Sequence, residues 1–586
     1  MCGIFGYIGA RTDAPEIVLK GLKKLEYRGY DSWGIAGVAN GEITIDKHIG
    51  KIGDASVVLP DSSIAIGHTR WATHGGVTVE NAHPHFDCSK NIALLHNGIV
   101  ENHSDIKKNI LKKEHIFLSE TDTEVIVHLI EELLLEYPFK EAVRQAFLLL
   151  RGLNAIVVVK NDENEIIACK NGSPLAVGIG ENELLLASDA TGIIPYTKKL
   201  LFLKDMEMVT LSTDVKLFSL QSGDELEIIS EVVDWEVEDA DMGTYPHYMI
   251  KEIHEQPTVL RNIAKNYDEQ IEEFASIISQ AYGTFFIAAG TAFYSCLAGT
   301  YLFSINAKKH VNAAVASEFN YLEDFLTSKS LIIAVSQSGE TIDVIEPLQR
   351  AQEKGSKIAG LVNNLGSTLF RMADYKILLG AGPEQAVAST KAYIAQIAVL
   401  FLVSYAMDNR LEEGKKLLLS SAEVTEKLLA DERIDEIKKL AVTLAKTENI
   451  FIIGRGLSYP SALEAALKIK EMTYIHTEGF AGGELKHGTM ALISKGTPVI
   501  VFAPLDDTYE AILSNAMEVK SRGAMVIGVS PQDSPIFDTW IPVPDIGQAS
   551  CIAQIIPIQL LSYYIAVEKN LDPDKPRNLA KSVTVK

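Results

Sequence analysis

Residues 331–341 read Leu-Ile-Ile-Ala-Val-Ser-Gln-Ser-Gly-Glu-Thr. Five apolar residues predict a buried strand, and the polar residues after them predict a turn that opens a helix. A helix start rich in hydroxyl and backbone N–H groups can hold a phosphate without a positively charged side chain. One serine or threonine is enough to cap a helix, so the hydroxyl groups of Ser336, Ser338 and Thr341 favour phosphate binding over simple capping.

The sequence around this stretch alternates strand-like and helix-like segments, which predicts parallel sheets covered on both faces. The segments Phe285–Gly290, Leu331–Val335 and Ile358–Val362 each have a similar segment 165 to 167 residues later. The tripeptide Ile394-Ala395-Gln396 also recurs, as Ile552-Ala553-Gln554. Four landmarks in one order predict two copies of one α/β unit.

The N-terminal part of the chain has a different character. It is rich in short β-type runs, with helical segments near 14–26 and 121–136, which predicts an α+β domain. The expected parts of the chain are an N-terminal domain at 2–232, a linker at 233–247, α/β units at 275–414 and 441–577, and a polar tail at 578–586.

The composition is that of a globular protein. The 586 residues are 47% apolar and 22% charged, with a net charge of −23. This acidity disfavours nucleic-acid binding. The five cysteines are widely spaced and form no Cys-x-x-Cys pair, so disulfides are not expected. The apolar stretches 392–407 and 551–567 are short and contain glutamine, which predicts buried helices rather than membrane spans. We expect a cytoplasmic protein with neither nucleic-acid nor membrane partners.

Cys2 is a candidate nucleophile. Removal of Met1 would leave Cys2 with a free α-amine, whose usual pKa of roughly 7.7–8.0 lets it act as a base near neutral pH. The nucleophile and its base then belong to one residue. Taken alone, Cys2 is better explained as an ordinary cysteine beside a strand.

Three further motifs contain groups that suit the recognition of an amino acid. Arg70 can bind a carboxylate through two parallel N–H groups. The Asn97 side chain and the Gly98 amide can donate to an oxyanion. Asp122, where a helix is expected to open, can bind an ammonium group. Each motif also has a simpler explanation as a strand end, a turn or a helix cap.

Together with Tyr27–Ser32, these motifs resemble the glutaminase domain of class II glutamine amidotransferases. The resemblance implies hydrolysis of glutamine to glutamate and ammonia. It implies that Cys2 is the nucleophile and that Asn97 and Gly98 form the oxyanion hole. The residues implied to bind glutamine or to shape its pocket are Arg70, Thr73, His74 and Asp122.

A metal site is an alternative for residues 81–88. His83 and His85 would share one face of an extended segment, and Cys88 is close to them in sequence. Further ligands at a recognisable spacing are lacking, and the resemblance implies a metal-free structural segment. We therefore expect no metal here.

The second α/β unit and the tail contain candidates for proton transfer. Lys468 and Glu471 are three residues apart, so they share a helix face, either as a surface ion pair or as a general base with a nearby cation. His487, in a glycine-rich loop, can move protons near neutral pH. Lys581 would normally be solvated, but a desolvated lysine can form a Schiff base.

These segments, with the tail at 578–586, resemble the sugar isomerase (SIS) repeats and C-terminus of the glutamine:fructose-6-phosphate amidotransferase family over nearly the whole chain. The resemblance implies conversion of glutamine and fructose 6-phosphate to glutamate and glucosamine 6-phosphate, in amino-sugar biosynthesis. It implies that ammonia travels internally, because water would protonate it. It also implies a homodimer and no metal, nucleotide or pyridoxal cofactor.

The resemblance assigns a role to each residue. Lys581 forms the Schiff base, Glu471 moves a proton from C1 to C2 beside Lys468, and His487 from the neighbouring subunit assists ring opening. Trp71 lies where the glutaminase meets the ammonia passage. The residues implied to hold the sugar and its phosphate are Thr291, Ser336, Gln337, Ser338, Thr341, Val387, Ser389 and Ala580, with Glu464 as a further lining residue.

Four positions depart from the family pattern, and none of them removes a catalytic group. Ala292 lacks a hydroxyl that the family often has, and Trp33 stands where a small residue is usual. Thr489 replaces a proline, and Lys586 stands where the chain usually ends in glutamate.

Three other functions fit the sequence less well. Other class II amidotransferases need a phosphoribosyl-pyrophosphate or ATP-pyrophosphatase loop, and the sequence shows neither. A sugar-phosphate regulator without activity would have lost Cys2, Glu471, His487 or Lys581. A deglycating isomerase would not need a glutaminase.

Overall fold

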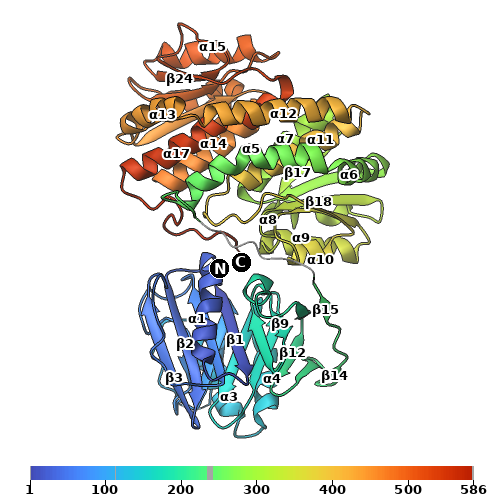
Figure 1. Cartoon of the computed structure of the whole chain (residues 1–586), viewed down its shortest axis with the longest axis vertical. Coiled ribbons are helices and arrows are strands. Elements are labelled where there is room, and N and C mark those ends of the chain that lie inside the picture. The colour runs from blue at the N-terminus through green and yellow to red at the C-terminus, as the bar shows by residue number, and fades with distance from the viewer. Residues whose placement is uncertain (1, 113, 234–241, 584–586) are drawn as a thin grey trace. The chain divides into compact units, whose positions relative to one another are not determined.

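The computed structural model divides the chain into two units (Figure 1). The first unit is Met1–Glu238 with Ala580–Lys586, and the second is Asp239–Leu579. Much of the expected linker at 233–247 lies outside the described residues, as do Met1 and the end of the tail. The structure describes residues 2–112, 114–233 and 242–583.

The first unit contains two antiparallel sheets. Their strand orders are β15-β11-β9-β10-β1-β4-β2-β3 and β14-β13-β12-β8-β7-β6-β5. The strands are β1 (Gly3–Gly9), β2 (Ser32–Ala39), β3 (Glu42–Ile49), β4 (Ile64–Arg70), β5 (His85–Phe86), β6 (Ile92–Gly98), β7 (Asn154–Lys160), β8 (Ile166–Asn171), β9 (Ala176–Ile179), β10 (Glu183–Ala187), β11 (Lys199–Phe202), β12 (Glu207–Leu211), β13 (Val215–Ser219), β14 (Glu225–Leu226) and β15 (Glu231–Val232).

Helices cover the outer faces of these sheets. One apolar cluster lies between the sheets, a second lies under α1, and a third lies under α3 and α4. The result is an αββα sandwich, which confirms the predicted α+β domain. Its helices are α1 (Ala14–Leu25), η1 (Glu26–Arg28), α2 (His103–Asp105), η2 (Ile106–Ile110), α3 (Glu124–Leu133), α4 (Phe139–Leu148) and η3 (Ala190–Gly192).

Strand β4 lies at the centre of its sheet, between β1 and β2, and all seven of its residues are buried. Helix α1 packs so closely on it that a Cβ on Gly67 would lie 2.5 Å from Val18. The unusual Trp33 is also accommodated here. Its ring is buried in β2 and stacks on His48 of β3, with ring centroids 4.4 Å apart.

The second unit contains two five-stranded parallel sheets with the orders β17-β16-β18-β19-β20 and β22-β21-β23-β24-β25. The two orders are equivalent, which confirms the predicted duplication. The strands are β16 (Gly283–Ala288), β17 (Asn312–Val315), β18 (Ser330–Ser336), β19 (Lys357–Val362), β20 (Tyr375–Leu378), β21 (Asn449–Gly454), β22 (His476–Ala481), β23 (Pro498–Phe502), β24 (Met525–Ser530) and β25 (Thr539–Pro542).

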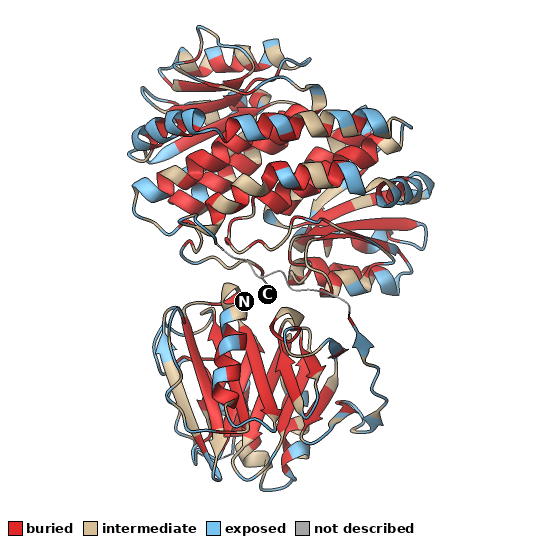
Figure 2. Ribbon diagram, in the orientation of Figure 1, coloured by how far each residue is buried: buried red, intermediate tan, exposed pale blue. Residues whose placement is uncertain are grey.

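Helices surround both sheets, and Figure 2 shows the strands and the helix faces that cover them as buried. These helices are α5 (Tyr248–Asn266), α6 (Asp268–Gln280), α7 (Gly290–Ile305), α8 (Ala316–Phe319), η4 (Glu323–Phe325), α9 (Ile342–Glu353), α10 (Thr368–Met372), α11 (Lys391–Ala406), α12 (Leu411–Leu428), α13 (Asp431–Leu444), α14 (Ser458–Thr473), η5 (Gly482–His487), η6 (Thr489–Leu492), α15 (Tyr509–Lys520), η7 (Gly547–Ala549), α16 (Ser550–Ala553) and α17 (Ile556–Glu568).

The two glutamines of the repeated tripeptide have equivalent roles. In the first copy, Ser295 of α7 donates to the side chain of Gln396 at 3.0 Å. In the second copy, Ser458 of α14 donates to Gln554, which in turn donates to Ser461. These hydrogen bonds satisfy amides in a buried helix layer. The segment Gly547–Glu568 is long and apolar enough to cross a membrane, but 89% of its most apolar part is buried within the protein, as in a core helix.

Candidate active sites

Cys2 lies directly before β1 and next to the end of β4. The antiparallel pairing of these strands places Gly3 opposite Thr69, so the chain after β4 passes the Cys2 side chain. The backbone N–H of Trp71 donates to the Cys2 sulfur at 3.3 Å. The thiol therefore has a fixed place where two central strands of the first sheet end.

Side chains from two other segments hold the Cys2 carbonyl group. Asn97 Nδ2 donates to it at 3.0 Å, and Arg28 Nε at 3.3 Å. Burial raises the pKa of the Cys2 thiol, while Arg70 and Arg28 act in the opposite direction. Two cations near a half-buried thiol favour the thiolate that a nucleophile needs.

Asn97 and Gly98 form the last two residues of β6. The ring of His68 donates from Nε2 to Asn97 Oδ1 at 3.0 Å, which turns the Asn97 amide N–H groups toward Cys2. Burial lowers the pKa of His68 to about 3, so this ring is neutral. Gly98 has a φ of +137°, and a Cβ there would lie 2.3 Å from the Leu153 carbonyl oxygen. Only glycine fits this position.

The other expected glutamine-binding residues lie on the loop after β4 and before α3. The guanidinium of Arg70 donates to the carbonyl groups of His74 and Gly76, so it shapes this loop. Thr73 on the loop is exposed and His74 is half-buried. Asp122 is buried and accepts from the Val100 backbone N–H at 2.7 Å, two residues after the oxyanion-hole candidate Gly98.

Asp189 supports this site, although it is not among the residues predicted from the sequence. Its carboxylate accepts from Tyr27 at 2.7 Å and pairs with Arg28 at 3.1 Å. Arg28 in turn holds the Cys2 carbonyl group. Asp189 is 161 residues from Arg28, and no local pattern marks it.

The structure does not support a metal site on His83 and His85. His83 Nε2 lies 2.9 Å from the hydroxyl of Thr123, and His85 Nε2 lies 3.2 Å from that of Thr121. Burial lowers the pKa of both rings well below the usual value. One nitrogen of each ring, Nε2, therefore anchors the segment that contains Asp122.

The candidate phosphate site lies at the carboxyl ends of β16 and β18. The sheet reverses its strand order at this pair, which is where ligands bind in open α/β sheets. Ser336 Oγ accepts from the Gly339 N–H at 3.0 Å and fixes the turn. Thr341, the N-cap residue of α9, makes no side-chain capping hydrogen bond. Simple capping therefore does not explain this hydroxyl.

Residue Thr291, in the first turn of α7, connects this edge to the second repeat. Lys468 Nζ of α14 donates to Thr291 Oγ1 at 3.0 Å. The same ammonium lies 3.4 Å from Glu464 and forms a shorter ion pair with Glu471. Lys468 and Glu464 are fully buried, whereas the Glu471 side chain is 14% exposed. The structure thus brings together four expected site residues, which are Thr291, Glu464, Lys468 and Glu471.

The charges of this cluster differ from residue to residue. Burial raises the pKa of the Glu464 carboxyl to about 8, although Lys468 acts in the opposite direction. Burial lowers the pKa of Lys468, but the two carboxylates outweigh it, so the ammonium stays charged. At neutral pH, Glu464 keeps its proton, and the charged Lys468 pairs with the Glu471 carboxyl group. A carboxyl group beside a cation is suited to act as a general base.

Substitution of Glu464 by glutamine is expected to change the pH dependence of stability. The Glu464 pKa is raised on folding, so its contribution to stability is complete below about pH 4.5 and is lost as the pH rises to about 8. The unfolding free energy of the wild type should fall relative to Glu464→Gln by up to about 5 kcal/mol across this range. This change in relative stability is measured from the unfolding midpoints of both proteins at several pH values. A difference that stays constant with pH would mean that Glu464 is ionised in the folded protein.

The remaining expected sugar-site residues are spread over several segments. The Val387 N–H donates to the Asp574 carbonyl at 2.9 Å, and Ser389 donates to Glu384 at 3.0 Å. His487 ends η5 and is exposed. Ala580 and Lys581 belong to the first unit, so their roles in the sugar site stay predictions.

Comparison with known proteins gives the family of the chain. The isomerizing glutamine–fructose-6-phosphate aminotransferases of Thermococcus kodakarensis and Bacillus subtilis are 42% and 43% identical to it, over all of both chains in each case. The chain belongs to this aminotransferase family. A model of the glutamine amidotransferase domain matches residues 68–195 of this aminotransferase, and a model of the SIS domain matches 277–404 and 443–567.

The structure of the aminotransferase agrees with these matches. Each region that the SIS model matches contains one of the five-stranded parallel sheets. The solved C-terminal domain of glucosamine-fructose-6-phosphate aminotransferase from Francisella tularensis is 30% identical in sequence and superimposes with a TM-score of 0.54. The match covers 57% of this chain and 100% of the solved domain. The fold of the second unit is therefore that of tandem SIS domains.

Proposed function

We propose that this aminotransferase hydrolyses glutamine and uses the ammonia to convert fructose 6-phosphate to glucosamine 6-phosphate. The observation that carries the proposal is the similarity over the whole chain to proteins named for this activity. The products are one glutamate and one amino sugar for each glutamine and fructose 6-phosphate consumed. We place this reaction in amino-sugar biosynthesis in the cytoplasm.

The glutaminase half uses Cys2. Its sulfur attacks the side-chain amide carbon of glutamine, and the α-amine exposed by removal of Met1 takes the thiol proton. Asn97 Nδ2, already directed toward Cys2, and the Gly98 N–H donate to the oxyanion. Ammonia leaves, and water then cleaves the thioester to release glutamate. Arg70, Thr73, His74 and Asp122 bind the amino-acid end of the substrate or shape its pocket.

The isomerase half uses the cluster on α14. Lys581 forms a Schiff base with the sugar carbonyl, and ammonia then replaces Lys581 on that carbon. Glu471, which pairs with Lys468, moves a proton from C1 to C2 of the sugar imine. The residues that bind the sugar and its phosphate are Thr291, Ser336, Gln337, Ser338, Thr341, Val387, Ser389 and Ala580.

Two further features belong to the proposal. Ammonia passes internally near Trp71, which keeps it unprotonated and nucleophilic. The protein acts as a homodimer in which His487 of one subunit serves the sugar site of the other. The exposure of His487 is compatible with such a role, because an exposed ring can meet a second chain.

A two-product assay tests the proposal. Purified protein is given glutamine and fructose 6-phosphate, and glutamate and glucosamine 6-phosphate are measured separately. We expect the two products in equal amounts and strict dependence of the amino sugar on both substrates. Glutamate without amino sugar would refute the proposed transfer. The first variant to make would then be Ala292→Ser, which restores the hydroxyl that the family often has at this position.

A further inference from the structure

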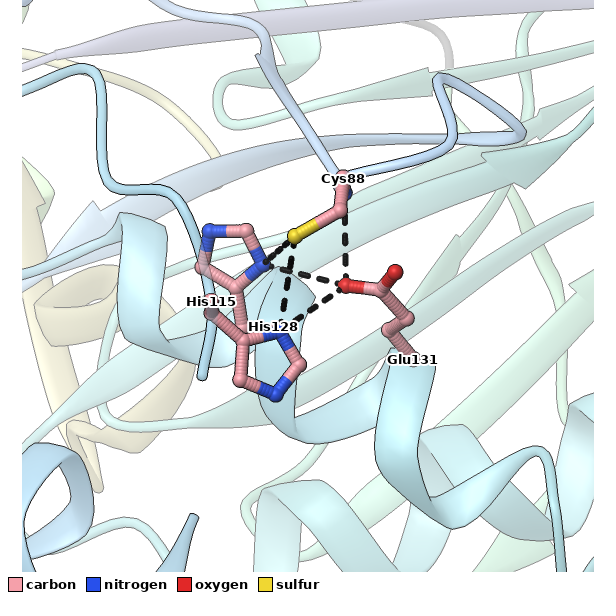
Figure 3. Close-up of side chains that lie close together, drawn as sticks. All are labelled: Cys88, His115, His128 and Glu131. Carbon is pink, nitrogen blue, oxygen red and sulfur yellow. Dashed lines mark hydrogen bonds and ion pairs between the residues drawn. The ribbon is translucent and has the colours of Figure 1, made fainter. Parts of the chain in front are cut away.

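A cluster of four side chains in the first unit takes no part in either proposed site. It consists of Cys88, His115, His128 and Glu131, and Figure 3 shows them converging on one point. Cys88 lies in the turn between β5 and β6, and His115 lies in the segment before α3. His128 and Glu131 lie on one face of α3. Three separate segments thus contribute to the cluster.

The distances between the four donor atoms suit a tetrahedral ion. The Cys88 sulfur lies 3.5 Å from His115 Nδ1 and 3.6 Å from His128 Nδ1. Glu131 Oε2 lies 3.1 Å from each of these nitrogens. Zinc bonds of about 2.0–2.3 Å place neighbouring ligand atoms of a tetrahedron about 3.3–3.6 Å apart. The two sulfur–nitrogen distances match this spacing, the two oxygen–nitrogen distances are slightly shorter, and all four donor atoms lie within 4.8 Å of one another.

An outer carboxylate orients the His115 ring, and a second one lies near the His128 ring. Glu132 Oε1 lies 3.0 Å from His115 Nε2, and Glu124 Oε1 lies 3.7 Å from His128 Nε2. The Glu132 carboxylate accepts a hydrogen bond, so it favours the proton on His115 Nε2 and leaves a lone pair on Nδ1. Carboxylate groups behind metal-binding histidines commonly have this role.

Without a cation, the centre of the cluster is rich in electron pairs. Two ring nitrogens, a sulfur and a carboxylate oxygen face one another, and the Cys88 backbone N–H donates to that oxygen at 3.2 Å. The His115 and His128 side chains are only 3% and 1% exposed, so water cannot compensate freely. Phe117 packs edge-on against His128 and shields it further.

We propose that these four residues bind a structural zinc ion. Binding forms Zn–S, Zn–O and two Zn–N bonds and releases the Cys88 thiol proton to water. The thiolate and the Glu131 carboxylate then balance the charge of the ion. Mixed sulfur, nitrogen and carboxylate ligands suit Zn²⁺ rather than Mg²⁺ or Ca²⁺. Four protein ligands leave no open position, so the ion is structural and not catalytic.

The ion would fasten the chain on both sides of Asp122. His115 precedes this residue and His128 follows it, and Glu124 already accepts hydrogen bonds from the Leu118 and Ser119 N–H groups. The zinc site would therefore hold the segment that carries the proposed ammonium-binding carboxylate. This consequence rests on the proposed glutaminase function, whereas zinc binding itself does not.

Metal analysis of the purified full-length protein tests the site. The protein is prepared without chelators or affinity metals, given equimolar Zn²⁺ and dialysed, and zinc is measured by mass spectrometry. We expect about one zinc per chain, at least a ten-fold loss in Cys88→Ala, and no loss in Cys2→Ala, which removes the other accessible thiol. The variant Glu132→Gln keeps all four ligands and should weaken zinc binding 10- to 100-fold in competition with a chelator.

Two results would overturn the proposal. One is wild-type protein with less than a tenth of an equivalent of zinc after this treatment. The other is Cys88→Ala that holds as much zinc as the wild type. Glutamine hydrolysis is measured on the same samples, where Cys88→Ala should raise the KM for glutamine. Zinc content without glutaminase activity would uphold the site and refute only the proposed function.

Discussion

Cys2→Ala is expected to abolish glutamate release from glutamine, with a fall in kcat of at least about 10³-fold. The oxyanion donors at Asn97 and Gly98 remain in the variant, but the atom that forms the thioester is gone. The change removes one sulfur from a residue whose carbonyl group still accepts from Asn97 and Arg28. The fold should therefore be retained, and glutamate is measured directly.

Ammonia provides the control for this variant. With fructose 6-phosphate and an ammonium salt in place of glutamine, Cys2→Ala should still make amino sugar, because Lys468, Glu471 and Thr291 all belong to the second unit. Cys169→Ala is the matched variant, since Cys169 is a buried core cysteine of the same unit. It should keep both activities. Glutamate release by Cys2→Ala at the wild-type rate would eliminate Cys2 as the nucleophile.

Glu471→Gln is expected to lower amino-sugar formation by about 10²- to 10⁴-fold, the usual contribution of a general base. Glutamine keeps the size of the side chain and removes its basicity. Glutamate release should continue, because Cys2 and its partners lie in the other unit. The comparison variant Glu464→Gln should lose far less activity, since burial keeps the Glu464 carboxyl protonated below about pH 8. Equal losses in the two variants would contradict the assignment of the base.

The same variant tests the role of His487 across subunits. Glu471→Gln and His487→Ala, each inactive alone, are co-expressed with different tags so that mixed dimers can be isolated. A mixed dimer has one site with both defects and one intact site, so it should show about half of the wild-type amino-sugar activity. Mixed dimers without activity would show that His487 serves its own chain.

Much of the fold was predictable from local patterns. The apolar segments 285–290, 331–335 and 358–362 with their later copies are strands because buried parallel strands are continuously apolar. The recurrence of Ile-Ala-Gln placed equivalent helices in both copies. The spacing of Lys468 and Glu471 placed them on one helix face. These properties depend on the periodicity of helices and strands, which neighbouring residues determine.

Contacts between distant segments needed the tertiary structure. Asp189 reaches Arg28 across 161 residues, and His83 and His85, weighed as an alternative metal site, contact threonine hydroxyls. Cys88 meets His115 and His128 from 27 and 40 residues away.

The protonation of Glu464 was also decided by packing. The sequence by itself determined the two kinds of unit, their repeats and the residue types of both sites. Only the packing of α14 against α7 determined that Glu464 lies fully buried while Glu471, about two turns away, stays in reach of water. Burial, and with it the pKa of an acid, depends on what the rest of the chain places around it, and no local spacing encodes that.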